Sequence, residues 1–200
     1  PCTDFGHNGV VDLTEGLRVR SRANYLVTSP PVVFNGVVIV GSAIGDNRAT
    51  DLERGVIRAF DAITGAPRWS FDPIPDSPSH PAAGGWKPEQ SAVTGGANAW
   101  SVMTVDPDRG LVFVPTGSAS PDFYGGKRLG DNRFANSLLA LDAMTGTLPW
   151  AQQLVRHDLW DYDLAAQPVL VELDRRGGPL TAVIQATKTG MVFLFDRATG

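Results

Sequence analysis

An eleven-residue pattern occurs twice without a gap and decides the fold. Residues 59–69 read Ala-Phe-Asp-Ala-Ile-Thr-Gly-Ala-Pro-Arg-Trp, and residues 140–150 read Ala-Leu-Asp-Ala-Met-Thr-Gly-Thr-Leu-Pro-Trp. A third copy, residues 194–200, stops where its tryptophan would follow. Because each copy follows an apolar run, it predicts a strand, a tight turn with glycine at positive φ, and a second strand. The simplest role of the tryptophan and aspartate of each copy is to dock neighbouring units of the fold.

More strands are expected ahead of each copy. The clearest signal is Asn35-Gly36, a favoured two-residue turn between two apolar runs. The predicted strand pairs are residues 31–34 with 36–41, 101–105 with 111–114, and 168–173 with 181–186. About four strands per unit are typical of a β-propeller blade, and propellers close with four to eight blades. The chain is therefore expected to be all-β, a β-propeller fragment of about three four-stranded blades from a larger ring.

The spacing of the copies sets the expected domain organisation. Asp61 and Asp142 are 81 residues apart and Asp142 and Asp196 only 54, because a loop rich in Pro, Ser and Gly lengthens the first interval. We expect one partial propeller domain with the end of a preceding blade and a connecting loop at 1–27, a blade at 28–71, an inserted loop at 72–97, a blade at 98–154, an active-site loop at 155–164 and an incomplete blade at 165–200. This segment alone is expected to be inactive, since three blades leave strand edges open.

Composition excludes several classes of function. The 22 glycines and 15 prolines in 200 residues favour turns over helices. A net charge of −4 without a basic run argues against a nucleic-acid surface. The single cysteine, Cys2, excludes an internal disulfide and a zinc site built from cysteines. The sequence contains no run of about 18 apolar residues, so it predicts no membrane-spanning helix. It also contains no dinucleotide, phosphate-loop or serine-hydrolase motif.

The densest cluster of polar residues outside the repeat is residues 156–163, Arg-His-Asp-Leu-Trp-Asp-Tyr-Asp. A charged surface loop is usually solvated, which is one interpretation. Two aromatic residues interleaved with the acids favour another, in which carboxylates give oxygen ligands to a cation such as Ca²⁺ and one acts as a general base.

Four further loops carry candidate site residues. Each has a plain structural interpretation as a turn, a core contact or an exposed lysine. If the loops converge at one end of the propeller, they surround an axial pocket with oxygen ligands, an aromatic platform and a cation. The residues concerned are Asp46 and Asn47 in 41–47, Trp100 in 95–100, Ser120 in 116–122, and Lys188 in 187–190.

The repeat resembles the tryptophan-docking motif of quinoprotein dehydrogenases, which use pyrroloquinoline quinone (PQQ). Residues 157–164, His-Asp-Leu-Trp-Asp-Tyr-Asp-Leu, with Gln167-Pro168 resemble the membrane-type quinoprotein glucose dehydrogenase subgroup, as do residues 55–61, 120–122 and 188–190. The resemblance covers essentially the whole chain. It implies an eight-bladed propeller with PQQ and Ca²⁺ (or Mg²⁺) on its axis, in the periplasm or facing it from the cytoplasmic membrane.

The resemblance also implies roles for individual residues. Asp161 matches the catalytic aspartate and a metal ligand, and Lys188 matches the basic residue that bonds the quinone oxygens. Trp100 matches the indole on which PQQ stacks. Asn47, a metal ligand, and Asp46, beside the cofactor, match an Asp-Asn pair at the metal site. Ser120 stands where the subgroup often has a threonine that contacts PQQ, whereas Arg156 and Ala165 depart from the frequent His and Pro, which puts the substrate in doubt.

The reaction implied is oxidation of an aldose, glucose-like, or of a related polyol or alcohol to a lactone or carbonyl compound. Hydride would pass to PQQ, polarised by Ca²⁺ and Lys188, while Asp161 takes the hydroxyl proton, and the electrons would pass to a quinone acceptor. Neither nucleic acid nor a direct membrane contact is expected, and any membrane association would involve regions outside this segment.

Two alternatives stay open at the level of sequence. One is a non-catalytic propeller that binds proteins and shares only the docking repeats, which explains the repeats but not why the acidic aromatic loop and Lys188 occur together. The other is a quinoprotein alcohol dehydrogenase. That group has a pattern of adjacent cysteines near the cofactor, which residues 1–200 do not contain.

Overall fold

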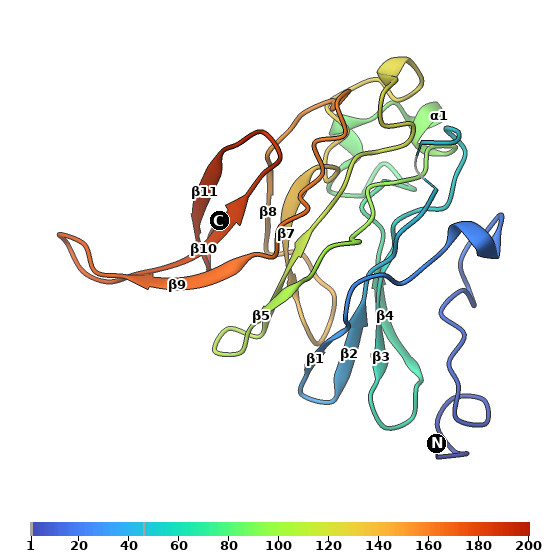
Figure 1. The fold of residues 1–200 in the computed structure, drawn as a ribbon, viewed down its shortest axis with the longest axis horizontal. Coiled ribbons are helices and arrows are strands. Elements are labelled where there is room, and N and C mark those ends of the chain that lie inside the picture. Colours follow the sequence, from blue (N-terminus) through green and yellow to red (C-terminus); the bar gives the residue numbers. More distant parts are fainter. Residues whose placement is uncertain (1, 46) are drawn as a thin grey trace.

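The computed structural model of the protein describes residues 2–45 and 47–200, which form three antiparallel β-sheets (Figure 1). The first has the order β1 Val32–Phe34, β2 Val37–Val40, β3 Ile57–Asp61, β4 Pro67–Phe71. The second has the order β5 Thr104–Asp106, β6 Leu111–Pro115, β7 Ser137–Asp142, β8 Trp150–Gln153. The third has the order β11 Val192–Asp196, β10 Leu180–Ala186, β9 Val169–Leu173. Sheets of consecutive antiparallel strands are the blades of a propeller, so the predicted fold class is confirmed.

The helical pieces are short and lie in the connections between strands. They are η1 Arg22–Asn24, η2 Ala83–Gly85, α1 Pro88–Ser91 and η3 Gly125–Lys127. Within the described ranges no helix has the length and apolarity needed to cross a membrane.

The predicted two-residue hairpin forms between β1 and β2. Phe34 pairs with Val37, and the intervening Asn35 and Gly36 have φ values of 44° and 77°. Two consecutive residues with positive φ make the turn whose twist matches that of the flanking strands. The Asn-Gly pair therefore sets the register of this hairpin.

The strand expected at 101–105 differs in its start. β5 pairs with β6 only over Thr104–Asp106. Ser101 instead donates its hydroxyl to the carbonyl of Ala165, at 2.7 Å. Residues just before β5 therefore contact the segment leading into the third sheet.

The aspartates of the three motif copies make the same turn. In each copy one carboxylate oxygen accepts the backbone N–H groups two and three residues later and the hydroxyl of the threonine, at distances of 2.8–3.1 Å. These aspartates are Asp61, Asp142 and Asp196. The turn is thus fixed by contacts within a few residues of sequence.

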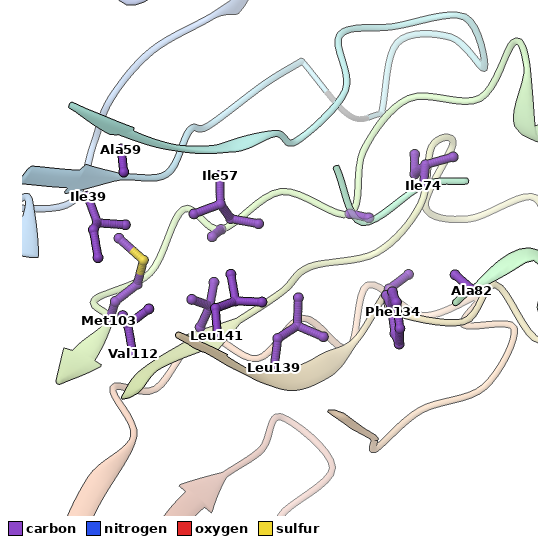
Figure 2. Close-up of a cluster of buried hydrophobic side chains, with 14 of the residues drawn as sticks. Ile39, Ile57, Ala59, Ile74, Ala82, Met103, Val112, Phe134, Leu139 and Leu141 are labelled. Atoms are coloured by element: carbon purple, nitrogen blue, oxygen red, sulfur yellow. The ribbon is translucent and has the colours of Figure 1, made fainter. Parts of the chain in front are cut away.

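The second sheet is buried on both faces. Leu139 and Leu141 of β7 belong to a core shared with the first sheet, while Leu138 and Ala140 of the same strand belong to a core shared with the third. Figure 2 shows the first of these cores, with Leu139 and Leu141 on the side of the second sheet and side chains of the first sheet across from them. Because side chains alternate along a strand, one apolar strand packs against both neighbouring sheets.

The long connections gather at one end of the sheets. Figure 1 shows α1 and the neighbouring loops at this end, and the turns joining β1 to β2 and β3 to β4 at the opposite end. In α/β and all-β scaffolds alike, loops at one end of a rigid sheet are where binding groups collect.

Candidate active site

Trp100, Asp161, Asp163 and Lys188 come together from three separate parts of the chain. The ammonium group of Lys188 donates to the backbone carbonyl of Asp161 at 2.8 Å and lies 3.4 Å from its carboxylate. It lies 3.9 Å from the Asp163 carboxylate and 6.0 Å from the centre of the Trp100 ring. A cation, two carboxylates and an aromatic face therefore lie close together in the fold.

The loop that carries Asp161 is folded around Asp158. The buried Asp158 carboxylate accepts the backbone N–H groups of Trp160 and Tyr162 at 3.0 and 2.6 Å. Between these two anchored positions Asp161 takes a φ of 59°, in the left-handed region that non-glycine residues rarely adopt. Asp158 therefore fixes the backbone that presents Asp161.

Asp158 also joins this loop to the second sheet. Its carboxylate accepts the hydroxyl of Ser118 at 2.6 Å and the side-chain amide of Asn136 at 3.0 Å. Ser118 follows β6 and Asn136 precedes β7, so the loop is attached to the ends of two central strands.

Arg128 is a residue of this region that sequence reasoning missed. Its fully buried guanidinium donates to the backbone carbonyls of Pro121, Asp122 and Asp158. It thereby holds the 121–128 segment against the loop that carries Asp161. Burial lowers the pKa of Arg128, and the nearby charges of Asp158 and Asp122 oppose that shift. No local sequence signal marks an arginine that bonds to a carbonyl 30 residues away.

The electrostatics favour proton uptake by Asp161. Burial is the main cause that raises the pKa of its carboxyl, and the charge of Asp163 adds to it. The ammonium group of Lys188 acts in the opposite direction. A carboxylate whose pKa is raised is a better proton acceptor, which suits a general base.

Within the described ranges no hydrogen bond or ion pair joins Ser120 or Asn47 to this cluster. Ser120 is fully buried, and its hydroxyl has no hydrogen-bond partner among the residues described. Asn47 is exposed in a turn, and across the described ranges no hydrogen bond or ion pair joins it to Asp161. Asp46 lies outside the described residues. The metal role expected of Asn47 stays a prediction.

The cluster fits part of a PQQ site. PQQ is a planar quinone with carboxylate groups, so an indole face suits its ring and an ammonium group suits its oxygens. The unpartnered hydroxyl of Ser120 is a further donor of the right kind. For a metal ion the fit is incomplete, because residues 2–45 and 47–200 hold no group of three or more His, Cys, Asp or Glu side chains able to bind one.

Propeller blades that bring an acid, a lysine and an indole together are what the quinoprotein class of dehydrogenases leads one to expect. A family model described as "PQQ: Glucose/ethanol/alcohol dehydrogenase, beta-propeller domain" matches residues 1–200. The chain belongs to this family of PQQ-dependent dehydrogenases, and its resemblance to the glucose dehydrogenase subgroup is confirmed.

Several curated relatives align with the whole chain. It is 43% identical over 202 residues to quinate/shikimate dehydrogenase (quinone) of Acinetobacter baylyi, covering 24% of that protein. It is 40% identical over 209 residues to quinoprotein glucose dehydrogenase of Gluconobacter oxydans, covering 25% of that protein. The chain thus spans about a quarter of the length of these relatives.

Solved structures show the same fold. The quinohemoprotein alcohol dehydrogenase from Comamonas testosteroni superposes with a TM-score of 0.83 at 32% identity, over 98% of this chain and 30% of the other. A europium-containing methanol dehydrogenase superposes with a TM-score of 0.77 at 24% identity, over 87% of this chain and 32% of the other, which shows a shared fold.

Proposed function

We propose that this chain forms one wall of the cofactor pocket in a PQQ-dependent dehydrogenase that oxidises a hydroxyl group of a sugar or polyol. The observation that carries the proposal is the convergence of Lys188, Asp161 and Trp100, with the Lys188 ammonium 3.4 Å from the Asp161 carboxylate and 6.0 Å from the Trp100 ring centre. Membership in the PQQ family indicates that PQQ is the cofactor to which these groups are suited.

In this proposal each residue has one task. Asp161 accepts the proton of the substrate hydroxyl, and Lys188 donates hydrogen bonds to oxygens of the cofactor. The Trp100 indole supports the cofactor ring. PQQ, when bound, would supply the two-electron oxidising capacity that the reaction needs. The hydroxyl carbon is oxidised to a carbonyl or, in an aldose, to a lactone.

Two substrate classes are supported by different relatives. Sequence motifs of the glucose dehydrogenase type favour an aldose, and relatives with that name are 36–40% identical to this chain. A cyclic hydroxy acid is the second candidate, favoured by the 43% identity to a quinate/shikimate dehydrogenase. That relative is named for a quinone acceptor, which supports transfer of the electrons to a quinone. Action in the periplasm, or at the membrane face toward it, is part of the same proposal.

A metal requirement is also proposed, with Ca²⁺ or Mg²⁺ bound by Asp161 and Asn47 together with ligands from elsewhere. Removal of divalent cations with EDTA and return of Ca²⁺ or Mg²⁺ tests this, with PQQ-dependent dye reduction as the readout. Full activity after exhaustive chelation would exclude it.

The central experiment is dye reduction by the full-length protein after addition of PQQ and Ca²⁺, with glucose, glycerol, quinate and ethanol as substrates. We expect oxidation of glucose or quinate, and loss of that activity in Asp161→Asn with an unchanged Tm. Asp174→Asn, which alters an exposed carboxylate outside the site, is the matched control. A full-length protein that binds no PQQ, or an Asp161→Asn variant with normal turnover, would overturn the proposal.

A further inference from the structure

We propose that Asp163 is a positioning residue that fixes the Trp100 indole and orients it toward Lys188. This inference rests on the proposed function and assigns a task to the second carboxylate of the loop. Oδ2 of Asp163 accepts the indole N–H of Trp100 at 2.8 Å, and Oδ1 accepts the backbone N–H of Ser118 at 2.6 Å. The side chain is only 7% exposed, so both bonds are shielded from water.

A carboxylate is the side chain that these contacts require. Of the two N–H donors, Trp100 precedes β5 and Ser118 follows β6, and each donates to a different oxygen of the carboxylate. Asparagine at position 163 has one acceptor oxygen and one NH₂ group, so one of the two donors would face another donor. An unpaired buried N–H is destabilising, and the indole would be free to move.

The charge of Asp163 matters for Lys188 as well. The Lys188 ammonium lies 3.9 Å from Oδ2 of Asp163, beyond hydrogen-bond distance but close enough for attraction in a partly buried site. Lys188 also lies over the Trp100 ring. Asp163 therefore contacts both groups that are proposed to hold the cofactor, without facing the reacting atoms itself.

The neighbouring glycine makes room for this carboxylate. A Cβ at Gly117 would lie 2.8 Å from Oδ1 of Asp163 and 3.0 Å from its Cγ, and the three nearest atoms all belong to this side chain. The backbone of Gly117 cannot easily withdraw, because its N–H donates to Asn98 and its carbonyl accepts from Asn136. A methyl group at position 117 would therefore press first on Asp163 and displace its carboxylate.

The test uses the full-length apo-protein and measures the Kd of PQQ by quenching of tryptophan fluorescence, with Tm as a check of folding. We expect Asp163→Asn and Gly117→Ala each to weaken PQQ binding about tenfold or more, the size of effect expected when a hydrogen bond to a charged group is lost. The matched controls Asp174→Asn and Gly84→Ala, at exposed positions, should bind PQQ as the unaltered protein does. If Asp163→Asn fails to fold, Gly117→Ala decides the question.

A double-mutant cycle shows whether Asp163 acts through Trp100. Trp100→Phe keeps an aromatic face but has no N–H to donate, so Asp163→Asn should have a much smaller effect in that background. Additive effects, or variants that bind PQQ with the unaltered Kd, would overturn the inference while the proposed function stands. If the unaltered protein binds no PQQ, the proposed function fails and this inference with it.

Discussion

Trp69, on the last strand of the first sheet, donates its indole N–H to the backbone carbonyl of Ala143, 3.1 Å away in the turn between β7 and β8. Trp150 of the second sheet makes the same bond to Arg197 beyond the third, also at 3.1 Å. The first sheet is thus joined to the second, and the second to the third, by a tryptophan and a motif turn. The docking predicted for the repeat tryptophans therefore takes place through a hydrogen bond from the indole N–H to a backbone carbonyl of the neighbouring motif.

The tryptophan bond should contribute measurably to stability. Trp69→Phe keeps an aromatic ring in contact with the neighbouring turn but removes the N–H donor. We expect the free energy of unfolding to fall by about 1 kcal/mol, the usual net value of one hydrogen bond. Thermal unfolding followed by calorimetry measures this. Trp160→Phe, at a residue 72% exposed, is the control and should leave Tm unchanged; equal Tm values for both variants would contradict the prediction.

The glycine of the motif turn should be required for docking as well as for the turn. Gly146 has a φ of 72°, and a Cβ there would lie 2.6 Å from the Trp69 ring. Gly36 has a similar φ of 77° but open space around it. Gly36→Ala is therefore expected to cost about 1–2 kcal/mol from backbone strain alone. Gly146→Ala should lower Tm clearly further, and equal losses in the two variants would exclude a steric role for Gly146.

The parts of the fold that could be predicted from sequence are those fixed by nearby residues. The turn at Asp61 depends on N–H groups two and three residues away, and the hairpin at Asn35-Gly36 on the conformation of those two residues. Such signals are local, so a short stretch of residues carries each of them completely.

The site was predicted less completely, because its contacts join distant segments. Resemblance pointed to Trp100, Asp161 and Lys188, and the structure brings these three together. It could not show that Asp163 bonds to Trp100, 63 residues away, or that Arg128 bonds to the carbonyl of Asp158, 30 residues away. Those contacts depend on how whole sheets pack, which residue spacing does not encode.

The charge of the motif aspartate should make stability depend on pH. The N–H and hydroxyl of Thr64 and the guanidinium of Arg68 hold the pKa of Asp61 well below its usual range, with the N–H of Thr64 the largest cause. A group whose pKa is lower in the folded state stabilises the fold above its unfolded pKa, about 3.9, and loses that contribution as pH falls through the folded value.

Asp61→Asn tests this dependence, since its amide oxygen can still accept the turn bonds while the charge is lost. The Tm difference between the unaltered protein and Asp61→Asn should be largest near pH 6 and shrink as pH falls below about 4. Tm is measured from about pH 6 to about pH 2.5, with Asp76→Asn, an exposed carboxylate, as control. A difference that is constant across this range would show that charge has no part in the turn.

Removal of the Asp158 carboxylate should destabilise the protein strongly. Asp158→Ala leaves the buried donors of Ser118 and Asn136 and two loop N–H groups without their acceptor. The buried charge of Arg128 also loses a nearby opposite charge. We expect a loss of about 3 kcal/mol or more in the free energy of unfolding. Calorimetry of Asp158→Ala beside Asp174→Ala measures it, and equal Tm values would mean that the loop does not depend on Asp158.

Lys188 should affect the reaction strongly and stability little. Its ion pair with Asp161 is about one third exposed on both sides, and such pairs contribute at most about 1 kcal/mol. Lys188→Met should therefore keep the Tm of the unaltered protein, while kcat/KM for the oxidised substrate falls by about 10²–10³, as when a donor to developing negative charge is removed.

Lys188→Arg keeps the charge and should retain more of the activity. Lys127→Met, at an exposed lysine outside the cluster, controls for loss of surface charge. A Lys188→Met enzyme with kcat/KM within about twofold of the unaltered protein would exclude lysine from the reaction and leave Asp161 and Trp100 as the groups to test.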